Sequence, residues 1–267
     1  MTRIAILSLD PIHIALAILA AYGFGLAKTG IAGIGILAVA VFSIAMPGRA
    51  AVGAVLPLLI VADTFAVIYY RSHADWSHLW RLFPWAALGI ALGAVAIGRI
   101  SDHQTSRLIG WLLIFLSAIQ GIQKLGAWRD GEDTSRRGGE QSSEIGLLAR
   151  GGVVTPLLGI LAGLATMVGN AAGPLMILYL LAARLPKMQF VGTAAWYFFC
   201  LNLFKLPFSV HAGLLTLNTL KVDLQLAVFV VLGALTGRPI LKRIDQNLFE
   251  LMAILFTAAA GMKLAFS

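Results

Sequence analysis

An internal repeat constrains this chain more than any local motif does. Residues 23–125 recur at 162–264 without a gap, so that every position moves by 139. Agreements at Leu or Ala arise by chance between apolar segments, and the informative ones involve Gly, Pro, Arg and Lys. The shift takes Gly30 to Gly169, Pro47 to Pro186, Gly53 to Gly192, Phe65 to Phe204, Gly98 to Gly237, Arg99 to Arg238 and Lys124 to Lys263. Self-similarity at one fixed period indicates a duplicated structural unit.

The composition indicates a chain that lies in a lipid bilayer. It is 59% hydrophobic with only 12% charged residues, and its mean hydropathy is +0.88, whereas a soluble domain has about 25% charged residues. The net charge of +8 comes from basic residues at the ends of apolar runs, as in membrane proteins. Nucleic acid is therefore not expected as a partner. The single cysteine, Cys200, excludes an intrachain disulfide and a cysteine-based metal site.

Ten apolar runs predict an all-α integral membrane protein. A full crossing needs about 20 residues, so two pairs of short, Gly-interrupted runs, one opening each half, are candidates for broken or re-entrant hairpins. The ten runs cover residues 11–27, 31–46, 50–70, 83–98, 108–126, 153–168, 171–184, 188–210, 222–237 and 247–266.

The polar segment 127–150 separates a first transmembrane repeat, 1–126, from a second, 151–267. Each half contains an odd number of crossings, whether its first pair spans the membrane or dips and returns. The second half must therefore enter from the opposite side, which predicts an inverted repeat. With 127–150 as a cytoplasmic linker, Lys205 lies within a span, thirteen of the other Lys and Arg residues lie on the cytoplasmic side, and six lie outside: Arg3, Arg49, Arg99, Arg107, Lys221 and Lys263. This bias favours both termini outside.

The Gly-rich turns at 27–35 and 165–174 are the clearest candidate binding site. Non-helical backbone at membrane depth is tolerated only where protein or a water-filled cavity satisfies it. Helix N-termini at such breaks carry partial positive charge and free N–H donors, which suit an anion. Paired interruptions in two halves are typical of a transport site, although the glycines could instead serve close helix packing. The candidate substrate-binding residues here are Lys28, Thr29, Gly30, Gly169 and Asn170.

The run 188–210 adds Thr193, Asn202 and Lys205 to the candidate substrate-binding residues. Asn202 and Lys205 are three positions apart and share a helix face. An ionisable residue inside a span is costly and usually functional. The alternative for Lys205 is that its side chain snorkels to the membrane surface.

Asp63 is the acid that lies well inside an apolar run, and it is the candidate for proton coupling. Burial disfavours its charged form, so the carboxylate could exchange protons during transport. The alternative is a structural carboxylate paired with a neighbouring donor. The repeat aligns Asp63 with Asn202 and Ala66 with Lys205, so the predicted site is chemically asymmetric.

The chain resembles the sulfite exporter TauE/SafE family of membrane proteins. The resemblance rests on the Gly-rich hairpin that opens each half, on Pro47 and Pro186 before the next span, and on the segments 51–53, 170–174 and 191–194. The family's first hairpin usually carries a denser glycine run that ends in Pro, and residues 36–41 here contain no proline. The resemblance implies a permease for small sulfur-containing anions such as sulfite or organosulfonates.

The leading hypothesis is a multi-pass secondary transporter or exporter of a small anion in a bacterial-type inner membrane, working by alternating access between the halves. The sequence carries no nucleotide-binding signature, which excludes direct ATP drive within this chain. No cofactor or metal is expected. The alternatives are a membrane-embedded enzyme, against which the five scattered histidines argue, and an accessory subunit without transport activity. The expected partners are a small anionic substrate and the bilayer, and a homo-oligomer stays open.

The first prediction concerns topology. Single cysteines at Ser142 and Ser267, introduced in a Cys200→Ala background, should report the side of the linker and of the C-terminus, since the basic bias places them on opposite sides. With an impermeant thiol reagent on intact cells, we expect labelling at 267 and not at 142. Labelling at 142 alone would reverse the assignment.

Overall fold

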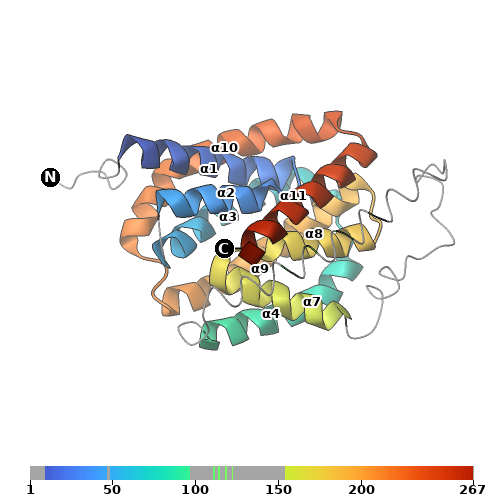
Figure 1. The fold of residues 1–267 in the computed structure, drawn as a ribbon, viewed down its shortest axis with the longest axis horizontal. Helices are drawn as coiled ribbons and strands as arrows, with labels where there is room; N and C mark the ends of the chain where they lie inside the picture. Colours follow the sequence, from blue (N-terminus) through green and yellow to red (C-terminus); the bar gives the residue numbers. More distant parts are fainter. Residues whose placement is uncertain are drawn as a thin grey trace.

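The computed structural model describes residues 10–46, 49–96 and 154–266, with the single positions 111, 114, 118 and 122. Within this part of the chain the structure is helical and has no strand, which confirms the predicted all-α class. Figure 1 shows the helices packed as one elongated bundle. They are α1 (Pro11–Thr29), α2 (Ile34–Ala45), α3 (Arg49–Tyr70), the short 3-10 helix η2 (Arg71–His73), α4 (Trp76–Ala96), α7 (Val154–Gly169), α8 (Ala172–Ala182), α9 (Lys187–His211), α10 (Leu217–Arg243) and α11 (Gln246–Phe266).

Four helices of the described residues are long and apolar enough to cross a membrane. These spans are Pro11–Thr29, Ala51–His73, Trp76–Val95 and Thr219–Arg243. Helices α2, α7 and α8 are shorter than the roughly 20 residues that a full crossing requires, in agreement with the interrupted pairs expected from the sequence.

Two helices extend beyond the apolar runs that predicted them. The run 83–98 belongs to a helix that begins at Trp76, and the run 222–237 to one that covers Leu217–Arg243. Helical hydrogen bonds lie within the backbone, so a helix continues past the point where its side chains become polar. The predicted linker 127–150 and most of the run 108–126 lie outside the described residues.

The packing of the helices follows the sequence repeat. Helix α1 packs along α10, α4 packs along α7, and α3 and α9 lie between these two pairs (Figure 1). The shift of 139 relates α1 to α7, α10 to α4 and α3 to α9. The first helix of each half therefore packs against the fourth helix of the other half, and the halves are interlocked.

The equivalent helices α3 and α9 run antiparallel through the centre. A Cβ on Gly53, near the start of α3, would lie 1.7 Å from Leu214 O, just after the end of α9. A Cβ on Gly192, near the start of α9, would lie 2.8 Å from Tyr70 O, at the end of α3. Each helix thus begins where the other ends. This is the arrangement that an inverted repeat requires, while its orientation in the membrane remains a prediction.

Glycine allows the outer pairs to approach closely. A Cβ on Gly25 of α1 would lie 2.0 Å from Val230 O of α10, and one on Gly163 of α7 would lie 2.1 Å from Ala86 O of α4. Small residues at such contacts let helix backbones meet, and van der Waals packing then stabilises the pair in lipid.

We expect Gly25→Ala to destabilise the fold, because the new methyl group meets backbone that cannot rotate away. Overpacking of this kind costs about 1–3 kcal/mol. The matched control is Gly169→Ala, whose Cβ would meet no atom within 4 Å. Thermal unfolding of the purified protein in detergent should show a lower midpoint for Gly25→Ala alone. Equal midpoints for the two variants would contradict the close approach of α1 and α10.

Candidate functional site

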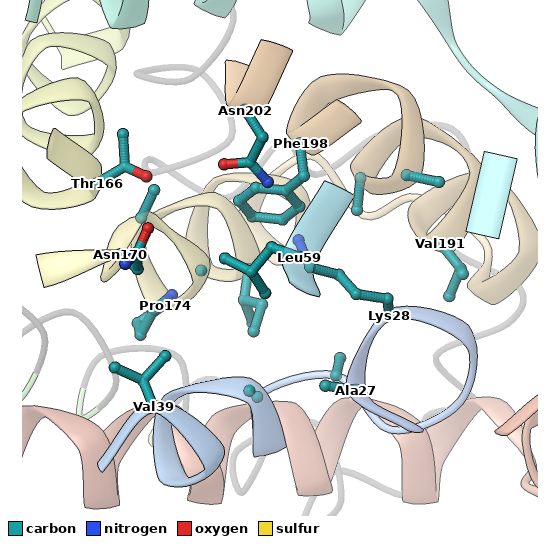
Figure 2. A pocket seen from close by; sticks show the side chains of 18 of the residues that line it. Ala27, Lys28, Val39, Leu59, Thr166, Asn170, Pro174, Val191, Phe198 and Asn202 are labelled. Atoms are coloured by element: carbon teal, nitrogen blue, oxygen red, sulfur yellow. The ribbon is translucent and has the colours of Figure 1, made fainter. Parts of the chain in front are cut away.

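The two helix breaks face each other across a small cavity. It has a volume of about 100 Å³ and is lined by both hairpin turns, by part of α9 and by Leu59 of α3. A buried water needs roughly 10–15 Å³ of such volume, so the cavity can hold several waters or one small anion. Figure 2 shows Lys28, Asn170 and Asn202 around it, together with Phe198.

The first break is held by contacts to α10 and α3. The hydroxyl group of Thr29, the last residue of α1, donates to Ala234 O at 2.8 Å. Tyr70 OH donates in turn to Thr29 O at 2.6 Å. Gly33 precedes α2 with a φ of 93°, a conformation that suits glycine. These contacts fix the end of α1 and thereby the position of Lys28.

A buried ion pair joins α1 to α3 beside the cavity. Lys28 Nζ lies 2.8 Å from Asp63 Oδ1, and Asn202 Nδ2 of α9 donates to Asp63 Oδ2 at 2.6 Å. The Asp63 side chain is fully buried, and that of Lys28 is 14% exposed. A carboxylate is tolerated in such apolar surroundings because Lys28 forms an ion pair with one of its oxygens and Asn202 donates a hydrogen bond to the other.

The Asp63–Asn202 contact joins the two positions that the sequence repeat makes equivalent. Two equivalent positions can touch only near the axis that relates the halves. The ion pair therefore lies at the centre of the repeat, where α3 and α9 cross.

Among the described residues that line the cavity, Lys28 alone carries a charged side chain. Its ammonium group also lies 3.8 Å from the centre of the Phe198 ring. Such a cation–π contact contributes about 2 kcal/mol or more when it is desolvated. Lys28 thus has a carboxylate, an aromatic face and the cavity around it.

The second break depends on Asn170, which has a φ of 55° between α7 and α8. Lys205 Nζ donates to Asn170 Oδ1 at 2.7 Å and also to Thr166 O. Asn170 Nδ2 donates to Val52 O of α3 at 3.0 Å. An ammonium group only donates and a carbonyl oxygen only accepts, so these two partners fix the orientation of the amide. Asn170 therefore links the break to both central helices.

The structure brings half of the predicted site residues to the cavity wall, namely Lys28, Gly30, Asn170 and Asn202. Lys205 is fully buried rather than extended to the surface, and it contacts the wall through Asn170. Thr29 makes packing hydrogen bonds instead, and Gly169 adjoins Asn170. The proton-coupling candidate Asp63 lies behind Lys28.

Thr193 is a fully buried residue of α9 that contacts the turn between α3 and α4 rather than the cavity. Its Oγ1 accepts the backbone N–H of Asp75 at 2.8 Å. Asp75 Oδ1 accepts from Ser77 Oγ at 2.6 Å, and this side-chain hydrogen bond lowers the pKa of Asp75. The carboxylate also accepts from Ser77 N at the start of α4. Thr193 thereby anchors the turn between α3 and α4.

Sequence reasoning missed Phe198 and Asp223. Phe198 lies one helical turn before Asn202, and that spacing could have placed it on the same face. Asp223 stood at the edge of a predicted run, but α10 begins earlier, so the residue lies inside a helix and is 4% exposed. Among the described residues no hydrogen-bond partner faces its carboxylate oxygens. Asp63 is thus not the sole acid inside a span.

A bundle of apolar helices with interlocked halves and a charged cavity between two helix breaks defines a membrane transport protein. The family comparison agrees, because the model of the sulfite exporter TauE/SafE family matches residues 14–264. This protein belongs to that family. Comparisons with curated proteins and with solved structures gave no match.

We predict strong coupling between Lys28 and Asp63. Lys28→Met leaves a buried carboxylate without its cation, and breaking a buried pair in this way costs about 3–5 kcal/mol. The double variant with Asp63→Asn should be more stable than Lys28→Met alone, because the unpaired charge is gone. Unfolding midpoints of both singles and the double form the cycle, with Lys221→Met at an exposed position as control. Additive effects would contradict the pair.

Proposed function

We propose that the protein is a secondary transporter of a small anion that works by alternating access between its two halves. The observation that carries this proposal is the buried group of Lys28, Asp63 and Asn202 at the crossing of α3 and α9, next to a cavity between two helix breaks. Charged side chains inside a membrane protein are costly and usually mark a substrate or ion pathway. In inverted-repeat transporters that pathway lies at the interface between repeats.

The charges near the cavity favour an anionic substrate. Protonated Lys28 and Lys205 carry two positive charges against the single negative charge of Asp63. Among the described residues Asp63 is the sole carboxylate that forms an ion pair with either lysine. With both lysines protonated, the group has one uncompensated positive charge, which a bound monoanion neutralises in a medium that screens charge poorly.

The cavity wall favours an anion of low charge and leaves apolar surface that an organic group could contact. Besides Lys28, its polar side chains are Thr166, Asn170 and Asn202, and the two amides already donate to Val52 O and Asp63. An inorganic dianion needs many donors to replace its hydration. Aliphatic and aromatic groups fill much of the remaining wall. Within sulfur-containing anions, this supports an organosulfonate or the sulfite monoanion over sulfate.

Asp63 offers a route for proton coupling. Its protonation would remove the charge that holds Lys28 at 2.8 Å, and the ammonium group would become available to the anion. A proton and an anion would then occupy the group together. In this scheme the two halves, 1–126 and 151–267, move against each other around the cavity, and 127–150 connects them on the cytoplasmic side of the inner membrane.

The test is anion flux in proteoliposomes, with sulfite, a short aliphatic sulfonate and sulfate as the panel. We expect saturable flux of the first two. Lys28→Gln should raise the apparent dissociation constant more than tenfold, because removing a buried charge that faces an anion costs about 2–5 kcal/mol. Lys205→Gln should have a smaller effect, since Asn170 lies between it and the cavity.

The matched control is Lys221→Gln, which removes the same charge at an exposed position and should change affinity less than threefold. A larger effect of Lys205→Gln than of Lys28→Gln would move the anion to the second break. The absence of flux for every anion of the panel, in folded protein, would refute the proposed substrate class.

A further inference from the structure

The cavity lies on one side of the contact between Asp63 and Asn202. Along α9 it is lined by residues that precede Asn202: Phe190, Val191, Ala194, Ala195 and Phe198. These residues run from the crossing point toward the start of the helix, where η2 and the end of α3 are packed. The cavity therefore extends from the centre of the bundle toward one end of it.

The equivalent side of α3 is closed. The shift of 139 relates those five residues to Ala51, Val52, Val55, Leu56 and Leu59. Of these, Leu59 alone lines the cavity. Side-chain burial is similar in the two sets, since Val55 and Leu56 are 1% and 0% exposed and Val191 and Ala195 are 7% and 3% exposed. The difference between the two sides is the cavity beside α9. Because α3 and α9 are antiparallel, the two sets lie on opposite sides of the crossing point. One sequence motif thus forms a cavity wall in one half and a packed contact in the other.

A single polar contact distinguishes the closed side from the open one. Asn170 Nδ2 donates to Val52 O and joins the second helix break to α3. The equivalent pair in the other half is Ile31 and Val191, and Val191 lines the cavity. An isoleucine side chain has no donor for a backbone carbonyl. The closed side therefore has a hydrogen bond that the open side cannot form.

We propose that α3 carries a second access path, lined by Val52, Val55 and Leu56, which opens when the hydrogen bond from Asn170 to Val52 breaks. The hydrogen bond from Asn170 to Val52, which we call the latch, favours the state described here. In the other state Ile31 packs against Val191 and closes the present cavity. This proposal rests on the alternating access proposed above. It adds the residues that line the path of the second state and the contact that favours the first.

The latch should bias the two states by a measurable factor. The net contribution of one hydrogen bond corresponds to an equilibrium shift of about two- to tenfold. Asn170→Ala removes the side-chain amide and its hydrogen bond to α3, and should shift the population toward the second state by that factor. It also removes the oxygen that accepts from Lys205, a contact within the second half. The ion pair of Lys28 and Asp63 does not involve this amide.

Cysteine accessibility tests the proposal in the full-length protein. Val55→Cys and Ala194→Cys occupy equivalent positions on the two paths, each made in a Cys200→Ala background and reacted with a small thiol reagent. We expect Ala194→Cys to react faster. Adding Asn170→Ala should raise the reaction rate at 55 about two- to tenfold and lower the rate at 194. Thr64→Ala is the control, because Thr64 is exposed and bonds within its own helix.

Disulfide trapping provides a second measurement. Its first pair also replaces Asn170, so if Asn170→Ala does not fold the test is the second pair, which keeps Asn170. The pair Val52→Cys with Asn170→Cys should cross-link in this state and block flux until a reductant is added. The pair Ile31→Cys with Val191→Cys should cross-link in the second state. Unchanged labelling at 55 in folded Asn170→Ala, or failure of the second pair to cross-link in a protein that transports, would overturn the latch.

Labelling requires no substrate, so the latch and the proposed function can fail separately. If the labelling shifts as expected but none of the tested anions is transported, the second path is supported and the proposed substrate class is wrong. If an anion is transported but the labelling does not shift, the proposed function is supported and the role of Asn170 is wrong.

Discussion

The central constraint on this structure is the placement of one carboxylate at the crossing of α3 and α9. Asp63 is fully buried, and a carboxylate in such surroundings requires donors on both oxygens. Lys28 arrives from α1 and Asn202 from α9, so the first half supplies the cation and the second half the amide. Three helices must therefore pack in register before the charge is stabilised. The cavity lies next to this group, and Lys28 and Asn202 form part of its wall.

The helices repeat between the two halves, but the polar residues at the centre of the structure do not. The backbone framework repeats with the shift of 139, but Lys28 is equivalent to Met167, and Lys205 is equivalent to Ala66. Met167 and Ala66 are both fully buried. Each half thus provides one lysine at a position where the other half provides packing. Had both halves kept the same residue at the position of Asp63 and Asn202, the contact would join either two carboxylates or two amides.

Much of the fold could be predicted from the sequence, because apolar runs, glycine-rich turns and the repeat are all local or periodic signals. The helical class and the two interrupted pairs follow from them. Contacts between helices could not be read in this way: Lys28 and Asp63 lie 35 positions apart without any spacing that pairs them. Thr29 and Thr193 carry hydroxyl groups that suit a binding site, but both hydroxyl groups form hydrogen bonds to the backbone of neighbouring segments instead. The repeat did contain one such contact, since Asp63 and Asn202 are equivalent positions that touch.

The interlocking of the halves has a consequence for biosynthesis. Tyr22 on α1 bonds to Thr236 on α10, 214 positions later in the chain. At a translation rate of about 5–20 residues per second, α1 enters the membrane roughly 10–40 seconds before its partner exists. During that interval the glycine face of α1 is open to lipid or to other membrane proteins. The order of synthesis thus leaves this face of α1 uncovered until α10 is inserted, although α2 and α3 can pack against its other side earlier.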